Sequence, residues 1–351
     1  MSNTYRVAVF GGDGIGPEIM APTLELLRGL GHDMAFDDCP AGAAAYLDGG
    51  TDLPEASLAT ARAADAILLS ALGDPAVRKA DGTEMTPQID IRIALGLYAG
   101  VRPVRIVPGM RSPLRTEAPV DFVLIRESTE GLFHTQGAGR VEADLAEETL
   151  RITRATTEKV CRFACELAAE RRAAGHPGRV TSVDKANVFR AFAFWREVFD
   201  GVAAGYPDLT ADHAYVDAVA LWMVTQPERW DVMVTENMFG DILSDLGAGL
   251  MGGLGMAPSA DIGDDHAVFQ PCHGSAPDIA GRGVANPFAM ILSAGMMLDW
   301  LGRRHGDDAL VRDGARVQAA VDACLAAGET TADLGGPLDT ERAAAAVMAR
   351  L

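Results

Sequence analysis

Short apolar runs of strand length alternate with helical stretches along this chain, and the alternation constrains the fold more than any other feature. The apolar runs span residues 7–10, 67–70, 122–125, 180–183 and 232–235. Stretches with helical spacing of apolar residues span 147–174 and 189–199. Strands that alternate with helices in this way predict an α/β architecture.

Size, charge and apolar content exclude several classes of protein. A chain of 351 residues suits two domains or one large α/β unit. The formal net charge of -19 would repel phosphate backbones, so we expect no nucleic-acid partner. The longest apolar stretch, residues 288–301, is interrupted by Ser293, Gly295 and Asp299 and is too short to span a bilayer, so we expect no membrane partner.

Cysteine usage and the start of the chain favour the cytoplasm. The five cysteines are odd in number and show no CxxC spacing, which favours reduced thiols. The first apolar run, residues 7–10, ends at Gly11 and Gly12, and no cleavage-type region follows it.

Two aspartates suggest a metal site. After the strand at 232–235 and a turn at Gly240, a helix is expected, and it places Asp241 and Asp245 at positions i and i+4 on one face. Like charges at this spacing weaken a helix by a few tenths of a kcal/mol. Mg²⁺ or Mn²⁺ would remove that penalty, since these cations prefer oxygen ligands. The alternative is a solvated acidic face.

A glycine-rich turn follows the first strand but departs from the dinucleotide fingerprint. Gly12 and Gly14 match the first two glycines of GxGxxG, whereas Pro17 occupies the place of the third. Proline suits the first turn of a helix. The segment therefore predicts a tight turn near a cofactor rather than a Rossmann phosphate loop.

Three arginines lie at the ends of apolar stretches: Arg92, Arg102 and Arg126. The planar guanidinium binds carboxylates through two hydrogen bonds and keeps its charge near neutral pH. If the three converge, they form a dicarboxylate pocket; taken singly, each is better explained as a surface or salt-bridge residue.

In combination, these motifs give the chain a resemblance to the isocitrate/isopropylmalate dehydrogenase family of metal-dependent β-decarboxylating dehydrogenases, over nearly its full length. The tail looks closer to isopropylmalate dehydrogenases than to NADP-linked isocitrate enzymes. The matching segments are residues 12–18, Arg92 with Arg102-Pro103, 126–131, 184–187, 215–217, 235–245 and 273–281.

The resemblance implies two intertwined α/β domains without a standard Rossmann phosphate loop. Residues 1–99 and 252–351 would form the cofactor-binding domain, and residues 100–251 the substrate, metal and dimerisation domain. The family forms homodimers with shared active sites, so Lys185 and Asp217 would come from the partner subunit.

The resemblance also implies a role for each site residue. Arg92, Arg102 and Arg126 would clamp the carboxylates of a hydroxy-dicarboxylate substrate, with Gln88 and Asn187 nearby. Asp241, Asp245 and Asp217 would hold Mg²⁺ or Mn²⁺, and Lys185 would assist deprotonation of the 2-hydroxyl. The cofactor-binding residues would be His273, Gly274, Ser275, Ala276, Asp278 and Asn286.

Asp278 predicts the choice of cofactor. A carboxylate accepts hydrogen bonds from the ribose diol of NAD and repels the 2′-phosphate of NADP. The alternative is a residue that only caps the loop.

The chain departs from the family at the position of the tyrosine acid, seven residues after Arg126, where Phe133 stands. A phenyl ring cannot donate the proton that completes decarboxylation, and losing a positioned acid typically costs about 10²–10⁴-fold in that step. Three readings remain open: His134 or water replaces the acid, the substrate needs no such acid, or the chain is impaired or regulatory.

The substituent on C3 of the substrate is less constrained. Gln88 and Asp90 make the loop before Arg92 more polar than an isopropyl group would require, and Pro87 reshapes it. We expect oxidative decarboxylation of a 3-isopropylmalate-like acid, with D-malate, tartrate or isocitrate as alternatives. A Mg²⁺-dependent phosphatase is disfavoured, because no DxD nucleophile motif follows an early strand.

Overall fold

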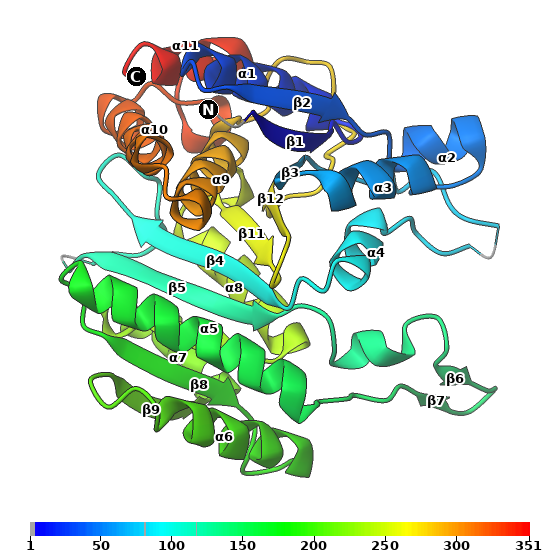
Figure 1. Ribbon diagram of the computed structural model, residues 1–351, viewed down its shortest axis with the longest axis vertical. Helices are drawn as coiled ribbons and strands as arrows, with labels where there is room; N and C mark the ends of the chain where they lie inside the picture. The colour runs from blue at the N-terminus through cyan, green and yellow to red at the C-terminus, as the bar shows by residue number, and fades with distance from the viewer. Residues whose placement is uncertain (1–3, 81, 117) are drawn as a thin grey trace. The chain divides into compact units, whose positions relative to one another are not determined.

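The computed structural model describes residues 4–80, 82–116 and 118–351, and the chain forms two compact units. One unit comprises Met1–Leu95, Val107–Pro113 and Met251–Leu351, and the other comprises Gly96–Ile106 and Leu114–Leu250. The resemblance assigns Val107–Pro113 to the second domain, whereas this segment packs with the first unit. Both units combine strands with helices (Figure 1), so the expected α/β fold is confirmed.

The first unit has five strands in the order β2-β1-β3-β12-β11. The pairs β1–β2, β1–β3 and β3–β12 are parallel, and β11 runs antiparallel to β12. The strand bounds are β1 Tyr5–Phe10, β2 Met34–Asp38, β3 Ala66–Leu69, β11 Pro258–Ile262 and β12 Ala267–Pro271. The helices are α1 Gly16–Gly29, α2 Ala43–Gly49, α3 Glu55–Ala63, α4 Pro87–Ala94, α9 Phe288–His305, α10 Asp308–Ala327 and α11 Thr340–Met348, with short 3₁₀ turns at Leu254–Met256 and Ala332–Leu334.

The second unit has five strands in the order β4-β5-β10-β8-β9, and all neighbours except β4 and β5 are parallel. Helices α5 and α6 pack together, and α7 packs against α8 (Figure 1). The strand bounds are β4 Ala99–Ile106, β5 Val120–Glu127, β8 Arg179–Asp184, β9 Thr210–Tyr215 and β10 Val232–Thr235, with a hairpin of β6 Arg140–Val141 and β7 Ala146–Glu147. The helices are α5 Arg154–Ala173, α6 Arg190–Ala203, α7 Val216–Thr225 and α8 Asn237–Leu250, with 3₁₀ turns η1 Leu132–Thr135 and η2 Pro227–Arg229.

The apolar runs of the sequence form the centre of each sheet. Every residue of β3 and β10 is buried, as is the second half of β1 from Val7 to Phe10. Continuous apolar runs are typical of parallel strands that are covered on both faces. A short hairpin of β6 and β7 follows residues 137–139.

Two helix boundaries differ from the prediction for a tertiary reason. Helix α5 begins at Arg154 rather than at 147, because Thr153 caps it and is itself held by the carboxylate of Glu130. Helix α8 begins at Asn237 rather than after Gly240, because Glu236 accepts hydrogen bonds from the backbone N–H groups of Met238 and Phe239. Helix α6 continues to Ala203, four residues past its predicted end.

The glycine-rich turn after β1 is built for close backbone contact. Asp13 accepts hydrogen bonds from the N–H groups of Ala43, Ala44 and Gly73, so its carboxylate ties the turn to the start of α2. The N–H of Ile15 donates to the carbonyl of Ser275 at 2.8 Å. The expected tight turn is therefore present, and its glycines serve packing between backbone segments.

Buried Glu127 fixes the loop that follows β5. It accepts hydrogen bonds from Thr129 N, Thr129 Oγ1 and Glu130 N, and it is 2% exposed. Burial raises the pKa of Glu127 to about 7, against the opposing effect of these hydrogen bonds.

All five cysteines are free thiols. None of the described helices combines the length and the apolar composition that crossing a membrane requires.

We predict that Gly14→Ala destabilises the protein by more than Gly31→Ala. A Cβ at Gly14 would lie 2.0 Å from the carbonyl oxygen of Ser275, whereas a Cβ at Gly31 would meet nothing within 4 Å. Both residues have positive φ, so both variants carry backbone strain of about 1–2 kcal/mol. Urea unfolding should show an additional loss of roughly 1–3 kcal/mol for Gly14→Ala, from the clash. Equal losses in the two variants would contradict this packing.

We also predict that Glu127 makes stability depend on pH. The folded state binds its proton more tightly than the unfolded state, whose glutamate pKa is 4.5. The contribution is therefore fully present below pH 4.5 and is lost as the pH rises through about 7. The free energy of unfolding of Glu127→Gln, minus that of the wild type, should increase by roughly 3 kcal/mol between pH 4.5 and 8. If the free energies of unfolding of the wild type and of Glu127→Gln change in parallel with pH, Glu127 is not uncharged in the folded protein.

Candidate functional site

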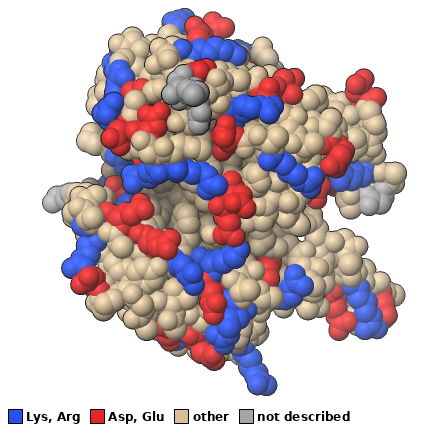
Figure 2. Space-filling model, in the orientation of Figure 1, with Lys and Arg blue, Asp and Glu red and all other residues tan. Residues whose placement is uncertain are grey.

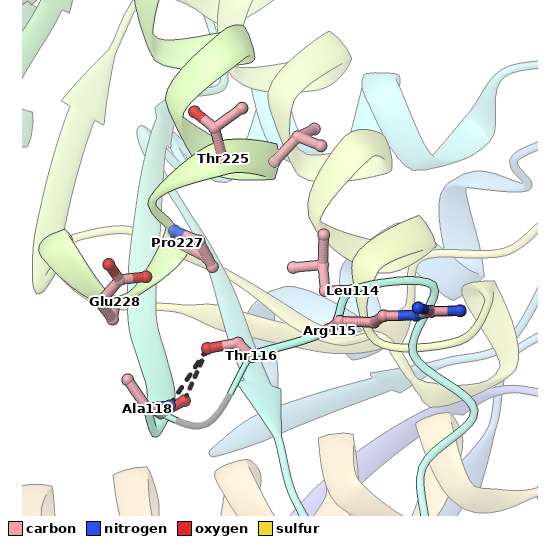
Figure 3. A pocket seen from close by; sticks show the side chains of 8 residues that line it. Leu114, Arg115, Thr116, Ala118, Thr225, Pro227 and Glu228 are labelled. Atoms are coloured by element: carbon pink, nitrogen blue, oxygen red, sulfur yellow. Dashed lines mark hydrogen bonds between the residues drawn. The ribbon is translucent and has the colours of Figure 1, made fainter.

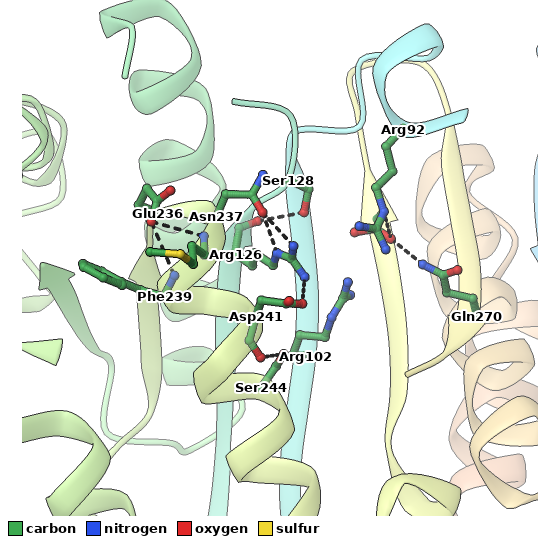
Figure 4. Close-up of polar contacts among 12 residues, drawn as sticks. Arg92, Arg102, Arg126, Ser128, Glu236, Asn237, Phe239, Asp241, Ser244 and Gln270 are labelled. Atoms are coloured by element: carbon green, nitrogen blue, oxygen red, sulfur yellow. Dashed lines mark hydrogen bonds and ion pairs between the residues drawn. The ribbon is translucent and has the colours of Figure 1, made fainter. Parts of the chain in front are cut away.

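Arg126 lies at the end of β5, beside the first turn of α8 (Figure 4). Its Nε and Nη2 donate to Asn237 Oδ1 at 3.0 and 2.6 Å, and its Nη1 contacts Asp241. The parallel register sets Arg126 opposite Thr235, two residues before Asn237. Gly240 leaves room for the arginine stem, since a Cβ there would lie 2.6 Å from Arg126 Cγ.

Asp241 and Asp245 lie one turn apart on α8, as the sequence predicts. Burial, followed by the charge of Asp241, raises the pKa of Asp245, while Arg126 and Arg102 oppose the rise. Arg102 is 5% exposed on β4. Two hard carboxylates one helical turn apart suit a divalent cation, which would relieve their repulsion.

Arg92 lies on α4 in the other unit and is anchored by a carboxylate. Its Nε donates to Asp261 Oδ2 at 3.0 Å, and Gln270 Nε2 donates to the same oxygen at 2.7 Å (Figure 4). Asp261 is fully buried on β11. The guanidinium is thus held in place by an acid that offsets its charge.

Lys185 follows β8 and pairs with Asp217 at the start of α7. The Lys185 Nζ to Asp217 Oδ1 distance is 2.5 Å, and hydrogen bonding from Lys185 lowers the pKa of Asp217. Asp184, which directly precedes Lys185 in the chain, is buried and accepts two hydrogen bonds from Arg196 and one from Ala186 N. This network fixes the backbone at Lys185 and leaves neighbouring Asn187 exposed.

The three aspartates predicted to share a metal do not gather within one chain. Among residues 4–80, 82–116 and 118–351, no group of three His, Cys, Asp or Glu side chains is arranged to hold a metal ion. Asp241 and Asp245 stand together with the arginines of their unit, and Asp217 stands with Lys185.

Phe133 and His134 lie in η1. Successive residues of a 3₁₀ helix point about 120° apart, so the two side chains diverge. His134 is exposed, whereas Phe133 is partly covered.

Gln88 stands one turn before Arg92 on α4, so the two residues share a face of that helix. Its Oε1 is buried and has no hydrogen-bond partner among the described residues. An acceptor left in this state costs roughly 1–3 kcal/mol unless a ligand supplies a donor.

The predicted cofactor loop, residues 273–281, is supported from α1. Glu18 accepts hydrogen bonds from Gly281 N at 3.1 Å, Ala285 N at 3.0 Å and Thr340 Oγ1 at 2.8 Å. Together with the bond from Ile15 to Ser275, these contacts hold both ends of the loop against the glycine-rich turn.

Several features of this loop suit a dinucleotide. His273 Nε2 is buried and has no hydrogen-bond partner in the described part of the chain, while Nδ1 bonds the carbonyl of Gly274. Burial lowers the pKa of the imidazole, which favours its neutral form. Ala276 has the only positive φ among the described non-glycine residues, 38°. Exposed Gly274 offers no side chain to block an approach, and exposed Asp278 forms no ion pair with any described residue.

Asn286 has a structural role as well. Its Nδ2 donates to Asp333, and its Oδ1 accepts from Phe288 N at the start of α9, both at 3.0 Å. The side chain is 7% exposed, and its predicted contact with adenine stays a prediction.

An open pocket of about 280 Å³ lies elsewhere in the second unit (Figure 3). It is lined by Leu114, Arg115, Thr116, Ala118, Val224, Thr225, Pro227 and Glu228, and it contains none of the predicted site residues. On the face shown in Figure 2, basic and acidic side chains are interspersed.

Four anchoring residues were missed by the sequence reasoning: Asn237, Asp261, Glu18 and Asp13. Two of them, Glu18 and Asp13, lie in the glycine-rich segment that follows the first strand, residues 11–18. Their polar side chains in a tight turn and a first helical turn were the available signal. Nothing local marks Asp261, because its partner Arg92 is 169 residues away.

Comparison with known proteins gives a consistent assignment. The family model for isocitrate/isopropylmalate dehydrogenase matches residues 6–347. A "3-isopropylmalate/3-methylmalate dehydrogenase" of Methanocaldococcus jannaschii is 42% identical and a 3-isopropylmalate dehydrogenase of Streptococcus pneumoniae is also 42% identical, each over 99% of both chains. The crystal structure of isocitrate dehydrogenase from Methylococcus capsulatus superposes with a TM-score of 0.87 at 37% identity, over 99% of both chains. The protein therefore belongs to the isocitrate/isopropylmalate dehydrogenase family of oxidoreductases, as its motifs predict.

Proposed function

We propose that the protein is an NAD-dependent, Mg²⁺- or Mn²⁺-dependent enzyme that oxidises and decarboxylates a (2R)-malate-type acid with a 3-isopropylmalate-like substituent. The observation that carries this proposal is the cluster at the start of α8. There, two carboxylates one turn apart adjoin buried Arg126, and Arg102 is near enough to influence the pKa of Asp245. A metal site beside carboxylate receptors is what a chelated hydroxy acid requires.

The substrate carboxylates would be bound by Arg92, Arg102 and Arg126. Each is at most 9% exposed, so a bound carboxylate would be largely desolvated and its hydrogen bonds correspondingly strong. Gln88 and Asn187 would contact the remainder of the substrate.

Asp241, Asp245 and the Asp217 of a partner subunit would hold the cation, and Lys185 of that subunit would assist deprotonation of the 2-hydroxyl. When bound, the metal supplies polarisation of the C2 oxygen and stabilisation of the enolate, and NAD supplies the hydride acceptor. Asp217 keeps the Lys185 ammonium in place through its short hydrogen bond.

The last proton must come from a group other than Phe133. His134 is exposed and adjacent, so we assign the proton to His134 or to water. A regulatory subunit that binds ligands without turnover is the second candidate, and Phe133 is the observation that favours it.

The cofactor would lie on residues 273–281. Asp278 would accept hydrogen bonds from the ribose hydroxyls, and His273, Ser275, Ala276 and Asn286 would contact the nucleotide. Because Asp278 forms no ion pair with a described basic residue, no neighbouring cation would offset its charge against a 2′-phosphate.

A homodimer with shared active sites is supported by an apolar face on α7 and α8. Leu221 and Ile242 are 59% and 61% exposed, and Val224 and Met238 are 45% and 40% exposed. A second copy would bury this face and would bring Lys185 and Asp217 to the partner's aspartates. Five free thiols support a reducing compartment, the cytoplasm.

We predict that the protein forms NADH and CO₂ in equal amounts from one of D-malate, tartrate, isocitrate or 3-isopropylmalate, with 3-isopropylmalate favoured. The activity should require Mn²⁺ or Mg²⁺, vanish with EDTA, and be at least about tenfold lower with NADP, given the carboxylate at 278. The measurement is NADH absorbance with trapped CO₂ across this panel. Phe133→Tyr serves as the matched variant.

The outcomes separate the candidates. NADH without CO₂ would place a defect after hydride transfer, and in that case Phe133→Tyr should restore CO₂ release. Ligand binding without any turnover, in both the wild type and Phe133→Tyr, would favour the regulatory subunit.

We further predict that two inactive variants complement each other. In a heterodimer of Lys185→Met with Asp241→Asn, one site would contain both defects and the other would contain neither. Co-expression in equal amounts should therefore restore about one quarter of wild-type activity, since half of the dimers are mixed and half of their sites are intact. If the co-expressed variants are no more active than the separate variants, each site is formed within one chain. Adding Leu221→Asp to both chains should abolish the restored activity, whereas the control Leu47→Asp, at a leucine that is more exposed than Leu221, should not.

A further inference from the structure

Asn237 holds Arg126 in a single orientation. Its Oδ1 accepts from both Nε and Nη2 of the guanidinium, and its Nδ2 donates to the carbonyl of Glu130 at 3.0 Å. Only one orientation of the amide satisfies all three contacts, so the side chain is fixed at both ends. Asn237 is 3% exposed, and water therefore does not compete for these bonds.

The surrounding chain reinforces this geometry. Glu236 starts α8 at Asn237 by accepting hydrogen bonds from the next turn, and Gly240 leaves space for the Arg126 stem. The backbone of Glu130, which accepts from Asn237, belongs to the loop that leads to Phe133. The Asn237 amide therefore connects the start of α8, the loop after β5 and the Arg126 guanidinium.

The choice of an amide matters because of charge. Arg92 is anchored by the buried carboxylate of Asp261, which offsets its positive charge. Asn237 anchors Arg126 through a neutral oxygen, so this anchor leaves the positive charge of the guanidinium intact. Arg126 also contacts Asp241 and acts electrostatically on buried Glu236, so a further carboxylate at position 237 would add to the negative charge that it already meets.

We propose that Asn237 is a positioning residue for substrate recognition: its neutral amide fixes the Arg126 guanidinium for a substrate carboxylate without cancelling its charge. The inference rests on the proposed function, in which Arg126 binds that carboxylate.

Two variants separate orientation from charge. Asn237→Asp keeps both acceptor contacts to Arg126 but adds a buried negative charge, whereas Asn237→Ala removes the contacts and keeps the charge of Arg126. Both should raise KM for the hydroxy acid about 10- to 100-fold, the range expected for losing a charge-assisted hydrogen bond, with kcat changed much less. KM of the wild type and of Asn237→Ala should rise with salt, and KM of Asn237→Asp should rise less steeply, because the added charge weakens the attraction of Arg126 for the substrate.

The measurement is steady-state kinetics at low and high salt with saturating NAD and Mn²⁺, together with calorimetric binding of D-malate and 3-isopropylmalate and thermal unfolding of each variant. KM near the wild-type value in a folded Asn237→Asp, or the same salt dependence in all three proteins, would overturn the inference and leave the proposed function standing. If Asn237→Asp does not fold, Asn237→Ala decides: a fall in kcat with unchanged KM contradicts positioning. A wild type that neither binds nor converts any acid of the panel would instead refute the proposed function, and the inference with it.

Discussion

The contact between Arg126 and the first turn of α8 is the interaction on which the rest of the site depends. It joins the carboxyl ends of two parallel strands, β5 and β10, through the side chains that follow them. Because β5 places Arg126 and β10 leads directly into α8, the proposed receptor for a carboxylate and the paired aspartates are held by the same few hydrogen bonds. In open α/β sheets, ligands bind at the carboxyl ends of the strands for this reason.

The glycine-rich turn supports the predicted cofactor loop by a route that differs from the Rossmann fold. In that fold, glycines let a pyrophosphate approach the backbone and the helix N-terminus. Here a Cβ at Gly14 would meet the carbonyl of Ser275, so the space near the turn is filled by the chain itself. Glu18 then holds the far end of the loop. The missing third glycine is thus a consequence of how the turn packs.

The chain retains the charged residues of its family motifs and departs at one aromatic position. Lys185, Asp217, Asp241, Asp245 and the three arginines are all present, and those that pair do so within organised networks. Phe133 lacks only the hydroxyl that a proton transfer would use. The departure therefore concerns the final step of the proposed reaction, in which substrate and metal binding would rest on other residues.

The sequence by itself determined the α/β class, five of the strands, the i, i+4 aspartates and the family, because these depend on local periodicity and on motifs whose order is visible in the chain. The tertiary structure alone decided where α5 and α8 begin and which residues hold the arginines and the cofactor loop. Asn237 lies 111 residues from Arg126, Asp261 lies 169 from Arg92, and Glu18 lies 263 from Gly281. No local pattern encodes such pairs, since each forms only when the sheet brings distant strand ends and loops together.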